Sequence, residues 1–362
     1  MNMSASQHSP FPAEFTAAVV QAAPGFCDLQ LSVEKTLHYI AEAARQGASI
    51  VAFPEDWIPG YPWWIWLDAP AWGFSKGWVR RFYENAFTYE SEGARLIAAA
   101  ARQHKIHVSL GVVERIGASL YVGNWIIDDS GESVSRRRKL KPTHMERTVF
   151  GEGDGSDLVV SETPLGRIGA LSCWEHLQPL TKFAMYSQNE QLHVAAWPGF
   201  SLYKDVAYSL SAEASLAATQ TYALEGGCFV LAPSSVTSQS MVDQICDAPE
   251  KHALFTTGGG HSVIYGPYGN LISERMPDTW EGVICAPIDL GEIAVAKAAA
   301  DPAGHYARPD VMRLLLNRTP AHRVHAFEPG LQEQRGPFPA AEGAVASAHA
   351  TTEWSSTEDV EG

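Results

Sequence analysis

One cysteine, Cys173, follows an apolar run that predicts a strand and precedes a segment that turns into a helix, in RIGALSCWEHLQPL. An elbow between a strand and a helix exposes a nucleophile and directs free backbone N–H groups at it, which lowers the pKa of a thiol and stabilises an oxyanion. A buried cysteine commonly serves only as a small hydrophobic side chain, however. This segment alone therefore favours a packing role.

A carboxylate, Glu55, comes directly after Pro54 at the end of the apolar run in SIVAFPEDWIPGYPWW. A carboxylate placed where a core strand stops lies at the mouth of a cleft, where loss of hydration raises its pKa into the range useful for a general base. By itself the segment is better explained by Glu55 or Asp56 capping the loop. The aromatic residues that follow are interpreted mainly as core or subunit interface, and they are Trp57, Tyr61, Trp63, Trp64 and Trp66.

An ammonium group, that of Lys139, lies at the end of a predicted strand in SRRRKLKPTHMERTVFGEGDG. In a dry site such a group can stabilise a developing negative charge. Alternation along a strand would send Lys139 and Lys141 to the same face, so spacing does not choose between them. The basic run 136–139 on an acidic chain is interpreted as a solvated strand face.

Other arrangements in these segments suit chemistry less well. Cys173, Glu175 and His176 could suggest a metal site, but alternation in an extended strand would point His176 away from the other two. The run GEGDG at 151–155 carries two acids that would repel a phosphate, so it predicts a tight turn. Ser201, in GFSLY, lacks the second glycine of a serine elbow, so it is a poor candidate for a nucleophile. Three histidines are interpreted as structural, namely His176, His193 and His261.

The elements that must position these residues follow an α/β pattern, in which short β-branched runs alternate with longer segments of helical period. Strands are predicted at 15–23, 49–54, 107–113, 121–128, 167–173, 192–198, 228–233, 261–266 and 282–290. Helices are predicted at 32–47, 92–105, 180–190 and 207–227. Gly47 stands where the first helix needs a C-terminal cap.

Composition and charge exclude several classes of partner. The formal charge of −15 and the pI near 5.3 argue against nucleic acid and anionic membranes, which would repel the chain. The five cysteines form no C-x-x-C pair, which fits neither a disulfide framework nor a zinc ribbon. The first residues lack the apolar core of a signal peptide, so the cytoplasm is the expected location. No stretch approaches the ~20 apolar residues of a spanning helix.

Three blocks in fixed order, PEDWIPGYP, RRKLKPTHMERTVFGEGDG and LSCWEHLQPL, resemble the signature of the nitrilase superfamily and of its true nitrilase branch. The likeness extends from about Phe15 to Pro309. It implies a four-layer α-β-β-α sandwich spanning 15–310, after a flexible start at 1–14. A C-terminal extension at 311–330 is expected to contact other subunits, and the composition of 331–362 predicts a disordered tail.

The resemblance also implies the residues of the site. Glu55, Lys139 and Cys173 match the Glu-Lys-Cys triad, because the first lysine of KLKPT is the catalytic one in the family. Glu146 matches a second glutamate that holds the lysine and orients the substrate. Three further positions are expected to bind substrate, and they are Tyr61, Trp174 and Trp197. Ser172 departs from the cysteine or asparagine of many relatives, which bears on substrate preference and leaves the triad intact.

The implied reaction is hydrolysis of an organic nitrile to a carboxylic acid and ammonia, through a thioimidate and then a thioester on Cys173. No metal or organic cofactor enters this path. Alternatives with the same triad are a cyanide-degrading enzyme or an amidase, and a different class is a catalytically silent binding or scaffold protein. The resemblance further implies homo-oligomers, either dimers built on a helical face or larger spirals, and the only other expected partner is the small nitrile.

Overall fold

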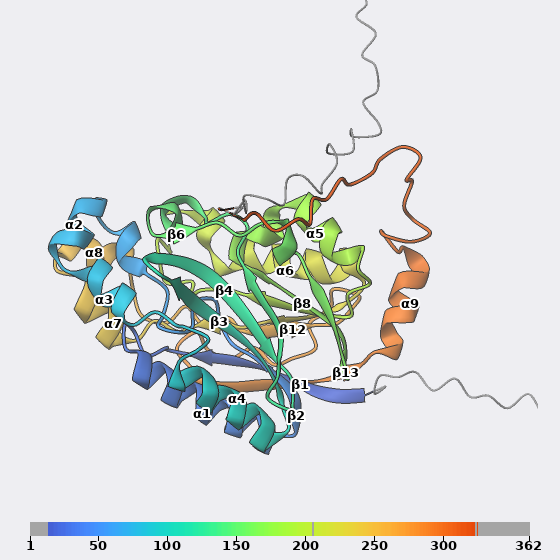
Figure 1. Ribbon diagram of the computed structural model, residues 1–362, viewed down its shortest axis with the longest axis horizontal. Helices are drawn as coiled ribbons and strands as arrows, with labels where there is room; N and C mark the ends of the chain where they lie inside the picture. The colour runs from blue at the N-terminus through green and yellow to red at the C-terminus, as the bar shows by residue number, and fades with distance from the viewer. Residues whose placement is uncertain (1–13, 205, 323, 325–362) are drawn as a thin grey trace, which may run out of the picture. The chain divides into compact units, whose positions relative to one another are not determined.

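Alternation of apolar side chains gives the strands two buried faces. In the first strand Ala17 and Val19 join one apolar cluster, while Ala18 and Val20 join another on the opposite face. Because successive side chains of a strand point to opposite faces, such a strand must be covered on both sides. The computed structural model describes residues 14–204, 206–322 and 324, and the described residues up to Pro320 form one compact unit (Figure 1).

The first sheet contains β1 (Glu14–Ala22), β2 (Ala48–Ala52), β3 (His107–Ile116), β4 (Ser119–Ile127), β5 (Ser133–Arg138), β6 (Phe150–Gly151), β11 (Ser234–Ser235) and β13 (Gly282–Asp289). Its order is β11-β1-β2-β3-β4-β5, with β13 beside β1 and β6 beside β4. The neighbours β1, β2 and β3 are parallel, whereas β3, β4 and β5 form an antiparallel meander. The carboxyl ends of β2 and β5 carry the segments with Glu55 and Lys139.

The second sheet contains β7 (Val160–Thr163), β8 (Gly166–Ser172), β9 (Leu192–Ala196), β10 (Phe229–Ala232) and β12 (Val263–Tyr265). Its order is β12-β10-β9-β8-β7, and β8, β9 and β10 are parallel. The nine strands predicted from the sequence all form, with ends shifted by up to three residues. The short strands β6, β7 and β11 were not predicted, because two to four residues carry too little alternation.

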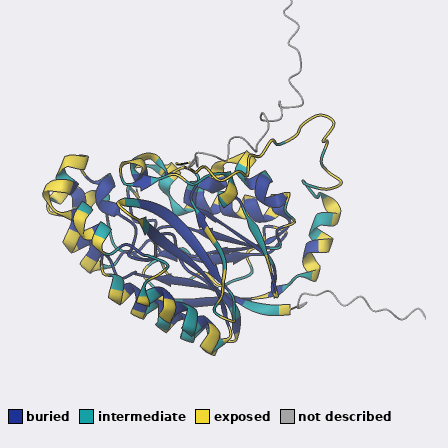
Figure 2. Ribbon diagram, in the orientation of Figure 1, coloured by how far each residue is buried: buried dark blue, intermediate teal, exposed yellow. Residues whose placement is uncertain are grey.

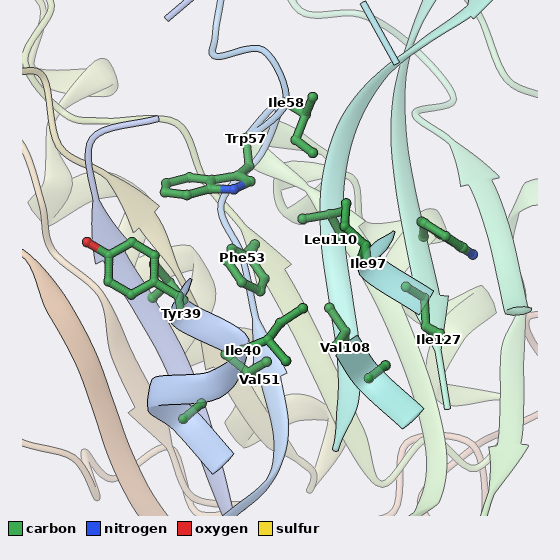
Figure 3. Packing of buried hydrophobic residues seen from close by; sticks show 14 of the residues in the cluster. Tyr39, Ile40, Val51, Phe53, Trp57, Ile58, Ile97, Val108, Leu110 and Ile127 are labelled. Atoms are coloured by element: carbon green, nitrogen blue, oxygen red, sulfur yellow. The ribbon is translucent and has the colours of Figure 1, made fainter. Parts of the chain in front are cut away.

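Helices cover the outer face of each sheet, so the fold is the predicted four-layer α-β-β-α sandwich. Helices α1 (Leu29–Arg45) and α4 (Glu92–His104) pack on the first sheet, where Ile40, Ile97 and Val108 share one apolar cluster (Figure 3). Helices α5 (Pro179–Tyr186) and α6 (Ala212–Gly226) pack on the second sheet. The central strands are buried, β5 and β7 are only partly buried, and the outward faces of the helices are exposed (Figure 2).

Helix α1 begins and ends where local chemistry allows. The side chain of Asp28 accepts a hydrogen bond from the backbone N–H of Leu31 at 2.9 Å, which satisfies one of the free donors of the first turn. Gly47 follows the last turn with φ of +83°, a left-handed conformation that favours glycine, so the predicted cap is confirmed. The face that carries Thr36, Ile40 and Ala43 is buried.

Several short helices were not predicted from the sequence. They are α2 (Pro70–Ser75), α3 (Trp78–Glu84), α7 (Gln239–Ile245), α8 (Pro249–Leu254) and α9 (Gly291–Ala299). Each spans nine residues or fewer, which gives a helical period little room to stand out, and α5 is the one helix of comparable length that was predicted. The part of the chain described here contains no helix long and apolar enough to span a membrane.

The ends of the chain fall partly outside the described residues. The predicted flexible start lies there except for Glu14, which begins β1. The predicted tail at 331–362 lies wholly outside them. Residues 311–322 form no helix or strand, and Arg318 donates a hydrogen bond to the carbonyl of Leu158 at 2.9 Å.

A buried ion pair joins the two sheets. Arg137, from β5 of the first sheet, donates two hydrogen bonds to Glu175, which follows β8 of the second, at 2.7 and 2.8 Å. The two side chains are 2% and 5% exposed, so the prediction of a solvated strand face is wrong for Arg137. It is also wrong for Lys139, which is buried, and it holds for Arg136, which is exposed. A bidentate pair without water fixes both distance and orientation between the sheets.

Arg137→Met should lower the free energy of unfolding by about 3–5 kcal/mol, because it leaves the carboxylate of Glu175 buried without its partner. Arg136→Met is the matched control on the same strand and should cost under about 1 kcal/mol. Adding Glu175→Gln to Arg137→Met removes the buried charge and should recover part of the loss. Urea unfolding measures all three. Equal losses for Arg136→Met and Arg137→Met would contradict this account of the sheet contact.

Candidate active site

The cysteine elbow predicted from the sequence forms at Cys173. Strand β8 stops at Ser172, a 3₁₀ turn runs from Cys173 to Leu177, and α5 follows. Cys173 has φ of 49°, a left-handed backbone that costs a non-glycine residue about 1–3 kcal/mol. In this conformation the backbone N–H of Trp174 donates a hydrogen bond to the Cys173 sulfur. That donor favours negative charge on the sulfur.

Glu175 holds the elbow in place from both sides. Its carboxylate accepts a hydrogen bond from the backbone N–H of Ser172 at 2.8 Å and another from that of Leu140 at 3.0 Å, besides its pair with Arg137. The same side chain therefore fixes the start of the cysteine turn and the residue after Lys139. Sequence reasoning missed this function, although the pattern S-x-x-E at 172–175 is the signature of a capped turn.

Glu55 reaches the site because the chain leaves β2 across the neighbouring strand β3. The backbone N–H of Glu55 donates to the carbonyl of Trp197 at 3.2 Å, which ties it to the end of the second sheet. The crossing passes close to Gly111, where an added Cβ would lie 1.9 Å from the carbonyl oxygen of Pro54. Only glycine leaves room for this path, which brings Glu55 from the first sheet towards the second.

Lys139 lies between two carboxylates. Its Nζ is 2.9 Å from Oε1 of Glu55 and 2.8 Å from Oε2 of Glu146, and all three side chains are 1% exposed or less. Lys141 instead lies at the surface and pairs with Glu152. The structure therefore separates the two lysines that spacing left equivalent, because the strand ends at Arg138 and alternation stops there.

Glu146 is held in turn by its own neighbours. It lies in the 3₁₀ turn His144–Thr148, and its Oε2 also accepts from the backbone N–H of Thr143 at 2.7 Å. Its Oε1 accepts from the Tyr61 hydroxyl at 2.7 Å, and that hydroxyl accepts from the indole N–H of Trp66 at 3.1 Å. Three donors, those of Lys139, Thr143 and Tyr61, therefore satisfy both oxygens of this buried carboxylate.

These residues converge with the nucleophile. One carboxylate oxygen of Glu55, one of Glu146 and the Cys173 sulfur all lie within 4.8 Å of one another. Three such groups could hold a metal ion, but the Lys139 ammonium already occupies the space between the two carboxylates and would repel a cation. The metal set considered from the sequence does not form: Glu175 turns to Arg137 and His176 turns to His193. Their segment is a 3₁₀ turn, so the assumption of an extended strand was wrong.

Burial controls the proton affinities of the set. Desolvation raises the pKa of Glu55 to about 8, against the opposing charge of Lys139. Desolvation also raises the pKa of the Cys173 thiol, and the nearby charge of Glu55 adds to it. Burial alone would lower the pKa of Lys139, but the charges of Glu146 and Glu55 raise it well above its usual value. The resting site thus holds a charged ammonium, a protonated thiol and a carboxylate of unusually high basicity.

A pocket of about 40 Å³ opens onto the Cys173 sulfur. Tyr61, Trp174 and Trp197, the positions expected to bind substrate, all line it. Trp63 and Trp66 line it too, although the sequence assigned them to the core or an interface. Further lining residues are Thr143, Glu146, Pro198, Gly199, Phe200, Leu202, Leu210 and Ser215. The surface facing the sulfur is therefore mostly aromatic and apolar.

Comparison with known proteins identifies the family of the chain. The family model of carbon-nitrogen hydrolases matches residues 16–298. A protein named nitrilase from Pseudomonas syringae is 53% identical over 303 residues, which cover 84% of this chain and 90% of that protein. An arylacetone-specific nitrilase of Alcaligenes faecalis is 48% identical, covering 86% and 87%. An aliphatic nitrilase of Rhodococcus rhodochrous is 49% identical, covering 84% and 83%.

Solved structures support the fold. The Caenorhabditis elegans NitFhit protein has a TM-score of 0.65 at 20% identity, covering 85% of this chain and 68% of that one. A carbon-nitrogen hydrolase from Helicobacter pylori has a TM-score of 0.65 at 17% identity, covering 82% and 96%. With the sequence relatives, these matches lead to one conclusion: the chain belongs to the carbon-nitrogen hydrolase family and, within it, to the nitrilase branch.

Proposed function

We propose that this chain hydrolyses organic nitriles to carboxylic acids and ammonia, with Cys173 as nucleophile and Glu55, Lys139 and Glu146 as its partners. The observation that carries the proposal is the buried cluster in which the sulfur lies within 4.8 Å of two carboxylates that clamp one ammonium. Relatives at 48–53% identity named as nitrilases support the choice of nitriles.

Formation of the first intermediate needs a base and a proton donor. Glu55 takes the thiol proton of Cys173 while the sulfur bonds to the nitrile carbon. Glu55 then gives this proton to the nitrile nitrogen, which yields a neutral thioimidate and returns Glu55 to its ionised form. Because burial raises the pKa of Glu55 to about 8, this carboxylate is a stronger base than an ordinary glutamate would be. The Lys139 ammonium and the Trp174 N–H stabilise the negative charge that develops during attack.

Two water molecules complete the reaction. The first adds to the thioimidate carbon with Glu55 as base, and the tetrahedral species expels ammonia to leave a thioester on Cys173. The second cleaves the thioester, which releases the acid and returns the proton to the sulfur. Lys139 stays charged throughout, because Glu146 neutralises it whenever Glu55 is protonated. Glu146 thus acts through Lys139, and its bond from Tyr61 keeps it oriented.

The pocket suits a small apolar nitrile. Its aromatic walls would contact the carbon substituent, while the charged groups lie only at the end that holds Cys173. We propose that Tyr61, Trp174 and Trp197 bind this substituent. The relatives named for arylacetone and aliphatic specificity share the same branch, so the walls are where substrate choice would be set.

We propose that the protein acts in the cytoplasm as a homo-oligomer. All five cysteines are free, which suits a reducing compartment. The second helical layer exposes large apolar side chains, including Leu180 of α5 and Leu224 of α6, at 68% and 61% exposure. Such side chains suit burial against a second copy of the chain.

Ammonia release from a panel of aliphatic, aromatic and arylacetonitriles tests the reaction, with acid and amide measured separately. We expect the acid to be the main product, and Cys173→Ala to lower kcat by at least about 10⁴-fold, since the covalent path is lost. Cys285→Ala, a cysteine of β13 outside the site, should retain activity. Release from amides or from cyanide but from none of the nitriles would overturn the choice of substrate.

The pH dependence of kcat/KM tests the role of Glu55. Below its pKa the carboxyl is protonated and cannot act as base, so activity should fall about tenfold per pH unit as the pH drops below about 8. An ordinary glutamate would show this limb near its usual value of 4.5. The enzyme is first incubated at each pH and returned to pH 8, which separates ionisation from unfolding. A flat profile between pH 8 and 5.5 would disprove the assignment.

A further inference from the structure

A line of buried hydrogen bonds runs from the back of the nucleophile into the second helical layer. Nδ1 of His176 lies 2.7 Å from the carbonyl oxygen of Cys173, and its Nε2 lies 2.9 Å from Nε2 of His193. Nδ1 of His193 lies 2.7 Å from Oε1 of Glu190, whose Oε2 accepts from the Tyr222 hydroxyl at 2.6 Å. Every one of these side chains is 1% exposed or less.

The protons on this line can be counted from the geometry. The Cys173 carbonyl only accepts, so Nδ1 of His176 carries a hydrogen. One proton must lie between the two Nε2 atoms and one between His193 and Glu190, because two lone pairs do not form a hydrogen bond. Three protons on two imidazoles and one carboxylate make the set electrically neutral. A buried line without net charge avoids the large cost of an isolated ion.

Close packing restrains the side chains of these hydrogen-bonded residues. The ring of His193 stacks on Tyr222 with centroids 3.8 Å apart, and the ring of His176 stacks on Trp197 at 5.4 Å. Glu190 fits only because residue 169 is glycine, where an added Cβ would lie 2.1 Å from its Oε1. Burial lowers the pKa of His176 well below its usual value, with a contribution from His193, so the His176 ring is neutral.

We propose that His176, His193 and Glu190 act as positioning residues that hold the Cys173 carbonyl and thereby keep the nucleophile in its left-handed conformation, with the sulfur facing Glu55. Cys173 at φ of 49° needs such a restraint, since the extended conformation of the strand before it is lower in energy. His176 is absent from the pocket wall, so it acts on the reaction through its neighbours, by its hydrogen bond to the Cys173 carbonyl and its ring contact with Trp197. The inference rests on the proposed nitrile hydrolysis.

The test compares two replacements of His176. His176→Asn retains an N–H in place of Nδ1, whereas His176→Leu has no donor and leaves the carbonyl of Cys173 unpaired. We expect His176→Leu to lower kcat about a hundredfold with KM within about twofold, and His176→Asn to recover at least about tenfold of that loss. Glu190→Gln can donate to His193 and accept from Tyr222 as a neutral acid does, so it should stay within about threefold of the wild type.

The rate at which iodoacetamide alkylates Cys173, followed by mass spectrometry, should change in the same order. This readout needs no substrate, so it tests the positioning role independently of nitrile hydrolysis. If the wild type releases no ammonia from nitriles, the proposed function is contradicted and the positioning role is still tested. Thermal unfolding identifies the folded variants. Folded His176→Leu that is alkylated at the wild-type rate would overturn the proposal, as would equal losses in the Asn and Leu variants. If His176→Leu does not fold, slow alkylation of folded His176→Asn and Glu190→Gln overturns it, and near wild-type rates support it.

Discussion

Every part of this site depends on one charge arrangement, an ammonium held without water between two carboxylates. Moving any one of these ions out of water costs several kcal/mol, and only their mutual contact makes the set tolerable. Lys139 at 2.8–2.9 Å from both Glu55 and Glu146 meets that requirement. Burial raises the pKa of Glu55 against the opposing charge of Lys139, and the second carboxylate, Glu146, adds to the increase. Glu55 is therefore a stronger base than a glutamate in water.

The arrangement can form only where the two sheets meet. Glu55 and Lys139 follow strands of the first sheet, whereas Cys173 follows a strand of the second. The apolar layer between the sheets sets their spacing. The ion pair of Arg137 with Glu175 sets their relative position at the edge where Lys139 and Cys173 lie. Glu175 then binds the backbone on both sides, before Cys173 and after Lys139. The nucleophile and the ammonium are thus placed by one carboxylate that touches neither.

Both the layered fold and the triad residues could be predicted from the sequence, but for different reasons. In long strands and long helices the spacing of apolar residues repeats often enough to be recognised in the sequence. For this reason β1, β3 and α1 were predicted. The triad came from a resemblance, since no single segment distinguished Lys139 from Lys141 or Cys173 from a packing cysteine. Short helices such as α8 carry no such period. The hydrogen bonds that join residues 173, 176, 193 and 190 were not predicted, because only the folded turn and strand bring these residues together. In the sequence alone, polar residues at these positions are indistinguishable from ordinary surface or core residues.

Trp197 links parts of the site that are otherwise separate. Its carbonyl holds the backbone of Glu55, its ring forms a wall of the pocket, and the same ring stacks on His176 behind Cys173. Attempts to redesign the preference of this enzyme by reshaping that wall would therefore disturb base and nucleophile together. Leu202 and Leu210 line the same pocket from other segments, which makes them the positions where cavity shape can be engineered with the reactive machinery left undisturbed.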